Sequence, residues 1–306
     1  MTHEITNAEL LRDFRQGKPR ALARAISAAE AGHGGEIVRA LYERTGRAMT
    51  IGLTGPPGVG KSTLASAVVR KARTLGKSAG VVSVDPSSPF SHGALLGDRI
   101  RLAEHFTDAS VFIRSMASRG HLGGLAGATA DAVTLMDAFG FDVVVIETVG
   151  VGQSEVAIAE LAQTTIVALQ PGSGDSIQVL KAGIMEIADV FVVNKSDHPM
   201  ADLLRREIRS AMGMLQWDGW VPELVVTQAL EGTGIDELWA AIERHLAYLN
   251  ETGEIESRRR EAFTHQVRQL ALGRIEKRLD RALNGDDSVG MDPYEAADRV
   301  IAKLGL

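Results

Sequence analysis

The chain has 306 residues, of which 45% are hydrophobic and 24% are charged, which is typical of a folded globular protein. Its 33 Lys and Arg residues against 39 Asp and Glu residues give a formal net charge of −6. An acidic chain is a poor match for general nucleic-acid binding, because phosphate backbones attract clustered positive charge. The absence of cysteine excludes disulfides, thiolate nucleophiles and cysteine-based zinc sites.

The first segment of the chain predicts helices and no targeting signal. Residues 1–20 mix acids, bases and amides and contain no apolar signal core. No run in the chain approaches the ~20 consecutive apolar residues that a membrane span needs. We therefore expect a cytoplasmic protein with no membrane partner. The helical spacing of apolar residues over residues 6–46 predicts two or three amphipathic helices, which form an N-terminal helical extension over residues 1–46.

From residue 49 onward, apolar runs of strand length alternate with segments of helix length. The seven runs are Met49–Thr54, Ala79–Val84, Val111–Met116, Asp142–Glu147, Thr164–Gln170, Val190–Asn194 and Pro222–Thr227. Such near-continuous Val, Ile and Leu runs, separated by helices, indicate a mostly parallel sheet that is covered on both faces. The sequence therefore predicts an α/β domain over residues 47–250.

The end of the chain predicts a helical arm. The breaker cluster Asn250–Gly253 is followed by a long charged helix from about residue 255 to 283, a second break, and a last helix at Pro293–Leu304. Such an arm, over residues 251–306, either serves oligomerisation or packs back on its own core. We favour a dimer contact.

A phosphate-binding loop follows the first strand. The segment from Gly55 to Thr63 matches the pattern G-x-x-x-x-G-K-[ST] in every fixed position and stands between an apolar strand and a helix. Its glycines let backbone N–H groups wrap around phosphate oxygens, and the helix start adds a positive dipole end. Lys61 is expected to neutralise the β- and γ-phosphates, and the Ser62 hydroxyl to bind Mg²⁺. The predicted phosphate-binding residues are Gly55, Pro56, Pro57, Gly58, Val59, Gly60, Lys61, Ser62 and Thr63.

Three acids are candidates for the metal side of this P-loop site. Glu147 ends a buried strand, where related enzymes hold Mg²⁺ or its waters, and the N–H of Gly150 is placed to meet the γ-phosphate. Asp85 ends another strand, and Asp98 lies in a Leu-Gly-Asp-Arg segment further on. Mg²⁺ keeps several waters, so one carboxylate beside Ser62 is chemically sufficient, and spacing alone does not decide among the three.

A second motif points to guanine. The strand Asp189–Val193 leads into Asn194, Lys195, Ser196 and Asp197, an N-K-x-D pattern about 130 residues after the phosphate loop. The Asp197 carboxylate can accept two hydrogen bonds from guanine N1–H and the 2-amino group, which adenine does not offer. The stem of Lys195 can cover the base, and Asn194 can tie the segment either to the phosphate loop or to the base edge. A later loop, Gln228-Ala229, is expected to bring the Ala229 N–H to guanine O6, although a plain connection is the alternative.

Several further strings bring the chain close to a known family. They run from the phosphate loop through Asp85–Pro89, Leu96–Arg99, Gly120–Gly124, Glu147–Glu155, Pro171–Asp175 and Asn194–Asp197. Together they resemble the MeaB/ArgK family, the methylmalonyl-CoA mutase-associated GTPases, which are metallochaperone-type P-loop GTPases. The resemblance covers roughly residues 6–250 by motif and the arm by layout.

This resemblance implies a homodimer that binds GTP or GDP with Mg²⁺ and hydrolyses GTP. Its implied partner is an adenosylcobalamin-dependent acyl-CoA mutase, whose cofactor loading it gates and which it protects from inactivation. It also implies that Asp85, Asp98 and Glu147 surround the metal, and that Lys181, in a partner-sensing segment over residues 170–183, takes part in GTPase activation. The role of Lys181 depends wholly on the resemblance. One departure is Gln228, where the family usually has Ser.

Other readings remain open at this stage. The same loop serves small-molecule kinases, which would need an acceptor pocket and a preference for ATP, and it serves interaction modules that bind nucleotide without turnover. A nickel-delivery role would be marked by clustered His or Cys near the switch loops, whereas His92, His105 and His121 are scattered. An older label of the family, an ATPase of basic amino-acid transport, conflicts with Asp197. The mutase itself is not specified: methylmalonyl-, isobutyryl- and ethylmalonyl-CoA mutases all remain candidates.

Overall fold

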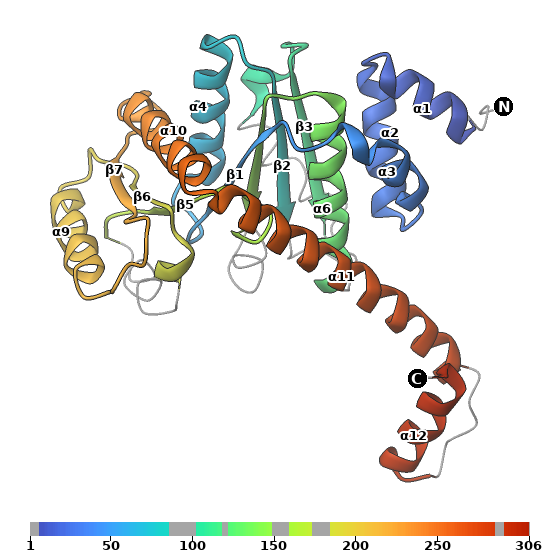
Figure 1. The fold of residues 1–306 in the computed structure, drawn as a ribbon. Coiled ribbons are helices and arrows are strands. Elements are labelled where there is room, and N and C mark those ends of the chain that lie inside the picture. The colour runs from blue at the N-terminus through green and yellow to red at the C-terminus, as the bar shows by residue number, and fades with distance from the viewer. Residues whose placement is uncertain are drawn as a thin grey trace.

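The computed structural model describes residues 6–85, 102–117, 122–148, 159–172, 184–284 and 291–305 (Figure 1). Its strands are β1 (Met49–Thr54), β2 (Ala79–Asp85), β3 (Val111–Ala117), β4 (Val143–Thr148), β5 (Thr164–Leu169), β6 (Val190–Val193) and β7 (Glu223–Val226). Its α-helices are α1 (Asn7–Arg15), α2 (Pro19–Glu30), α3 (Gly35–Leu41), α4 (Lys61–Thr74), α6 (Leu122–Phe139), α9 (Ala201–Met212), α10 (Ile235–Thr252), α11 (Glu254–Asn284) and α12 (Pro293–Leu304). Short 3₁₀ turns are η1 (Tyr42–Arg44), η2 (Ala103–His105) and η3 (Ile184–Ile187).

The described strands form one seven-stranded sheet in the order β3-β2-β4-β1-β5-β6-β7. Every neighbouring pair is parallel. The seven predicted apolar runs all form strands, and their ends differ from the prediction by at most one residue. Strands β4, β5 and β6 are buried along their whole length, as expected where helices cover both faces of a parallel sheet. The predicted α/β P-loop fold is therefore confirmed.

The strand order predicts a ligand-binding crevice at the carboxyl end of β1. The chain first fills one side of β1 with β2, β3 and β4, and then fills the other side with β5, β6 and β7. In open parallel sheets, ligands bind outside the carboxyl ends of the strands where the direction of winding changes. The carboxyl ends of β1, β4, β5 and β6 all lie at this edge.

Helices cover the sheet in two layers. On one face, α4 packs against β1, β2 and β4, and α10 packs against β5, β6 and β7. Leu64 and Val68 of α4 and Leu238 of α10 are buried in the same core cluster. On the other face, α6 packs together with α1–α3, and the rings of Phe14 and Phe139 meet edge to face at 5.1 Å. The predicted N-terminal helices thus share a core with α6, while the division of the chain at residues 46 and 250 stays a prediction.

The C-terminal arm starts with α11, which is separated from α10 by Gly253 alone. Helix α10 continues to Thr252, so the predicted break over residues 250–253 is reduced to Gly253, whose φ of 79° ends the helix. Helix α11 crosses α6 with its first turns and then runs away from the sheet to α12 (Figure 1). No helix in the described part of the chain is both long enough and apolar enough to span a bilayer.

A partly buried ion pair fixes the start of α11 to the sheet. The guanidinium of Arg258 donates to both carboxylate oxygens of Asp189, at 2.8 and 2.7 Å, and to the carbonyl of Gln163 at 2.8 Å. Asp189 is 5% exposed, and its carboxylate also accepts the N–H of Thr165 at 2.7 Å. His245 lies beside it, and burial lowers the pKa of that imidazole to about 4 although Asp189 acts in the opposite direction. A bidentate, hydrogen-bonded pair of this kind orients the helix that carries the arginine.

Candidate functional site

The phosphate loop takes a path that only glycine allows at two positions. Gly55 has a φ of 141°, and a Cβ atom there would lie 2.1 Å from the carbonyl oxygen of Ala168 in β5. Gly60 has a φ of 90° and stands at the N-cap of α4. A side chain at either position would meet a neighbour and strain the backbone. The glycine that the sequence pattern requires at position 55 is therefore also the residue that lets the loop pack against β5.

Lys61 lies inside the loop that precedes it. Its side chain is buried, and the ammonium donates to the carbonyls of Gly55 at 2.6 Å and Pro56 at 3.0 Å. It begins α4, whose first-turn N–H groups and positive dipole end face the same loop. The loop thus concentrates positive charge and N–H donors at the crevice, which is the chemistry that a polyphosphate needs.

Two predicted metal-binding residues meet behind the loop. The hydroxyl of Ser62 donates to a carboxylate oxygen of Glu147 at 2.5 Å, and the Ser83 hydroxyl donates to the other oxygen at 3.3 Å. Glu147 is 1% exposed and Ser62 is 2% exposed. A buried carboxylate and a hydroxyl oxygen form a hard donor set, which suits Mg²⁺ with phosphate oxygens and water as the remaining ligands.

Other predicted residues of the metal and switch region are only partly located. Asp85 is the last residue of β2 and pairs with Ala117 of β3, so its backbone lies at the crevice edge of the sheet. Asp98, Gly150 and Lys181 lie outside the described residues. Their roles stay predictions.

Asn194 joins the phosphate loop to the loops after β6 and β7. Its amide group donates to the carbonyl of Val59 at 2.8 Å. Its amide oxygen accepts the hydroxyl of Thr227 at 3.1 Å and the N–H of Ala229 at 3.2 Å. Since Asn194 is 3% exposed, these three bonds are buried. The predicted tie to the phosphate loop is present, and it reaches the third loop as well.

Asn194 competes with the predicted guanine base for the backbone N–H of Ala229. The Ala229 N–H already donates to Asn194, so a contact with guanine O6 requires that this bond be exchanged or shared. Gln228 faces Thr233 across a short antiparallel bridge, with its N–H on the Thr233 carbonyl at 3.0 Å. That bridge shapes the turn between β7 and α10.

Lys195 and Asp197 lie at the mouth of the crevice. Lys195 has a φ of 59°, the one positive value of a non-glycine residue in the described part of the chain. Its ammonium donates to the Gly58 carbonyl at 2.8 Å and to the side-chain oxygen of Gln170 at 2.6 Å. Asp197 is exposed, so its carboxylate is accessible to a base. The sequence did not predict any contact for Gln170. Its place directly after β5 was the only feature that could have indicated one.

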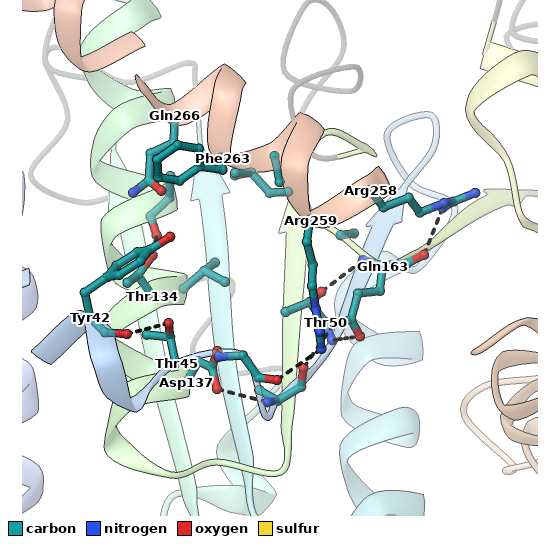
Figure 2. A pocket seen from close by; sticks show the side chains of 17 residues that line it. Tyr42, Thr45, Thr50, Thr134, Asp137, Gln163, Arg258, Arg259, Phe263 and Gln266 are labelled. Carbon is teal, nitrogen blue, oxygen red and sulfur yellow. Dashed lines mark hydrogen bonds between the residues drawn. The ribbon is translucent and has the colours of Figure 1, made fainter. Parts of the chain in front are cut away.

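A separate cavity lies at the opposite edge of the sheet. It has a volume of about 220 Å³ and lies between η1, α6 and the start of α11, near the beginning of β1 (Figure 2). Its polar walls are already paired: the Asp137 carboxylate accepts backbone N–H groups of residues 46–48, and Arg259 donates to the carbonyl of Gly46. The cavity is therefore part of the contact between the arm and the domain, and the phosphate loop is not among its lining.

Comparison with known proteins assigns the family. Residues 22–284 match the model of the methylmalonyl-CoA mutase-associated GTPase MeaB. The chain belongs to the MeaB family. GTPase ArgK of Escherichia coli is 36% identical over 280 residues, covering 88% of this chain and 85% of ArgK. A Pyrococcus horikoshii protein, named as a candidate GTPase, is 44% identical over 309 residues, covering 97% of this chain and 98% of that relative.

Two further relatives extend the comparison. A mouse protein named the mitochondrial homologue of methylmalonic aciduria type A is 35% identical over 265 residues, covering 80% of this chain and 64% of the mouse protein. Among solved structures, the LAO/AO transport system kinase superposes over the full length of both chains with a TM-score of 0.73 and 27% identity. Like the other members of the MeaB family, the chain is a P-loop GTPase that binds guanine nucleotide.

The Asn194 contacts predict a stability effect that does not need nucleotide. Asn194→Asp keeps the acceptor for Thr227 and Ala229 but removes the donor to Val59 and places a charge in a buried position. We expect the free energy of unfolding, measured by urea denaturation without nucleotide, to fall by about 3 kcal/mol. The exposed Asp197→Asn serves as the control and is expected to change it by less than about 0.5 kcal/mol. Equal effects of the two substitutions would show that the buried amide does not hold the loops together.

Proposed function

We propose that the crevice binds GTP with its phosphates in the loop from Gly55 to Ser62 and its base at Asp197. The observation that carries this proposal is the Asn194 amide, which connects the two halves of that site through buried hydrogen bonds. The exposed Asp197 carboxylate suits the N1–H and 2-amino donors of guanine, and the Lys195 stem covers one face of the base. The phosphate loop and Lys61 supply the donors for the triphosphate.

Mg²⁺ fits the donor set of Ser62 and Glu147, to which we add Asp85 and Asp98 as acids of the same region. The ion, when bound, neutralises charge on the phosphates. In this proposal Lys61 binds the β- and γ-phosphates, Ser62 and Glu147 hold the ion, and the N–H of Gly150 reports on the γ-phosphate. Lys181 is kept as a candidate for activation. These residues position the triphosphate and stabilise its charge, and these two effects are most of what phosphoryl transfer requires from a protein.

We further propose that GTP binding and hydrolysis serve an adenosylcobalamin-dependent acyl-CoA mutase, with methylmalonyl-CoA mutase as the first candidate. Support comes from the family description and from the name of the mouse relative. The protein would gate cofactor loading and protect the mutase, and its location in the cytoplasm stays a prediction from the sequence. A small-molecule kinase and a nucleotide-dependent interaction module without a mutase are the alternatives.

A homodimer through the arm completes the proposal. Six large apolar side chains of α11 are 40–53% exposed: Phe263, Val267, Leu270, Leu272, Ile275 and Leu283. They lie on a helix that extends beyond the sheet (Figure 1). An apolar surface of this kind on an extended helix is a typical protein contact, and a second copy of the arm offers the same surface.

The base site predicts a change of nucleotide preference. In Asp197→Asn the side-chain amide presents an N–H₂ group where guanine also has donors, whereas xanthine has a carbonyl at that position. We expect the affinity for GTP to fall by about 100-fold or more and the affinity for XTP to rise, in competition binding against a fluorescent guanine nucleotide. A variant that keeps its GTP affinity, or a wild-type protein that prefers ATP, would contradict the proposed base site and favour the kinase alternative.

The mutase proposal predicts partner-dependent turnover. The protein alone is expected to hydrolyse GTP slowly, at about 10⁻⁴–10⁻² s⁻¹ as unassisted GTPases do. Methylmalonyl-CoA mutase from the same source should raise this rate and should be retained from cell extract in the presence of a non-hydrolysable GTP analogue. Lys61→Ala should abolish the control of the mutase by GTP. Retained control in that variant supports the interaction module, and rapid turnover without any effect of the mutase refutes the gating role.

The arm predicts a monomer when its apolar face carries charge. Sedimentation velocity of the full chain should give a dimer, and the double variant Val267→Glu, Leu270→Glu should give a monomer with unchanged GTP binding. Met214→Glu is the matched control, since Met214 is 81% exposed in the loop after α9, away from the arm. If the double variant remains dimeric, the contact lies elsewhere.

A further inference from the structure

Gln170 lies between the two halves of the nucleotide site. It is the first residue after β5, the strand that stands beside β1 on one side and β6 on the other. The loops that leave those two neighbours are the phosphate loop and the Asn194–Asp197 segment. Gln170 therefore starts at the strand end that lies between these two loops.

Its side chain makes that connection through Lys195. The Gln170 oxygen accepts a hydrogen bond from the Lys195 ammonium at 2.6 Å, and the same ammonium donates to the Gly58 carbonyl at 2.8 Å. Hydrogen bonds from a charged donor are among the stronger ones in proteins. Two acceptors on different loops thus fix the end of a long side chain that would otherwise sample many rotamers.

The backbone of Lys195 adds to the constraint. Its φ of 59° belongs to the left-handed region, which a non-glycine residue adopts only at a steric cost. This conformation sends the lysine stem from the end of β6 back toward the phosphate loop. With the backbone and the ammonium both fixed, the four methylene groups between them have one course across the crevice mouth.

We propose that Gln170 is a positioning residue for the guanine nucleotide, which acts by holding the Lys195 side chain in the course that covers the base. The inference depends on the proposed placement of the base over Lys195. Gln170 does not touch the nucleotide in this role. Its loss frees the lysine stem, so bound nucleotide escapes faster while the phosphate chemistry is unchanged.

The test is a double-mutant cycle on the full-length protein, read by the dissociation rate of fluorescent GDP. Gln170→Met keeps the length of the side chain and removes the acceptor, and it should speed dissociation by about 3- to 10-fold. Lys195→Met should have a larger effect, and the double variant should dissociate as fast as Lys195→Met alone. Full additivity of the two effects, or a wild-type rate in Gln170→Met, would overturn the proposal.

Two further measurements distinguish a positioning role of Gln170 from a loss of folding stability. In Gln170→Met the KM for GTP should rise by about 3- to 10-fold, kcat should stay within about twofold, and the melting temperature without nucleotide should not change. Gln216→Met, at an exposed glutamine in the loop after α9, is the matched control and should resemble the wild type in every measurement. A fall in kcat equal to the rise in KM, or a lower melting temperature, contradicts a positioning role.

The same experiment distinguishes this inference from the proposed function. If the wild-type protein releases GDP and ADP at equal rates, the base site itself is wrong, and the role of Gln170 is refuted together with it. If the wild type retains GDP selectively and the cycle shows full additivity, the base site stands and the role of Gln170 alone is refuted.

Discussion

The nucleotide crevice depends on one buried amide. Asn194 holds the Val59 carbonyl with its N–H₂ group and holds the loop after β7 with its oxygen. The Asn side chain has a donor and an acceptor on one planar group, so it can join a backbone carbonyl to N–H and O–H donors at once. An Asp side chain would lack the donor, and a Leu side chain would lack both the donor and the acceptor. This position therefore requires an amide.

The phosphate loop is shaped by close packing as much as by its ligand chemistry. Gly55 approaches the Ala168 carbonyl so closely that no side chain fits, which presses the start of the loop against β5. The Lys61 ammonium then finds the loop carbonyls within hydrogen-bond distance. In the proposed site, a phosphate exchanges those contacts of Lys61 for charged ones. Because the backbone is fixed by the sheet beforehand, little conformational entropy remains to be lost on binding.

The sequence predicted the features that depend on local residue patterns. It missed the side-chain contacts between residues that are far apart in the chain. The seven strands follow from continuous apolar runs, and the turn from β1 into α4 follows from residue types at short, fixed spacing. The role of Asp197 in binding guanine stays a prediction. The pairs Gln170–Lys195 and Arg258–Asp189 join positions 25 and 69 residues apart, and an isolated Gln, Lys, Arg or Asp is most often a surface residue. The break before the arm was placed three residues too early, because Asn250 and Thr252 have weak helix propensity but still belong to the last turn of α10.

The two ends of β6 connect the arm with the base site. Asp189 directly precedes the strand and is fixed by Arg258 of α11, while Asn194 directly follows it. Between them, Val190–Val193 pair in register with Ile166–Leu169 of β5 and with Glu223–Val226 of β7. Side chains alternate along a strand, so a slip of one residue would turn Asn194 away from the phosphate loop. The ion pair at the start of the strand therefore helps to determine that the amide at its end faces Val59, although the two groups do not touch.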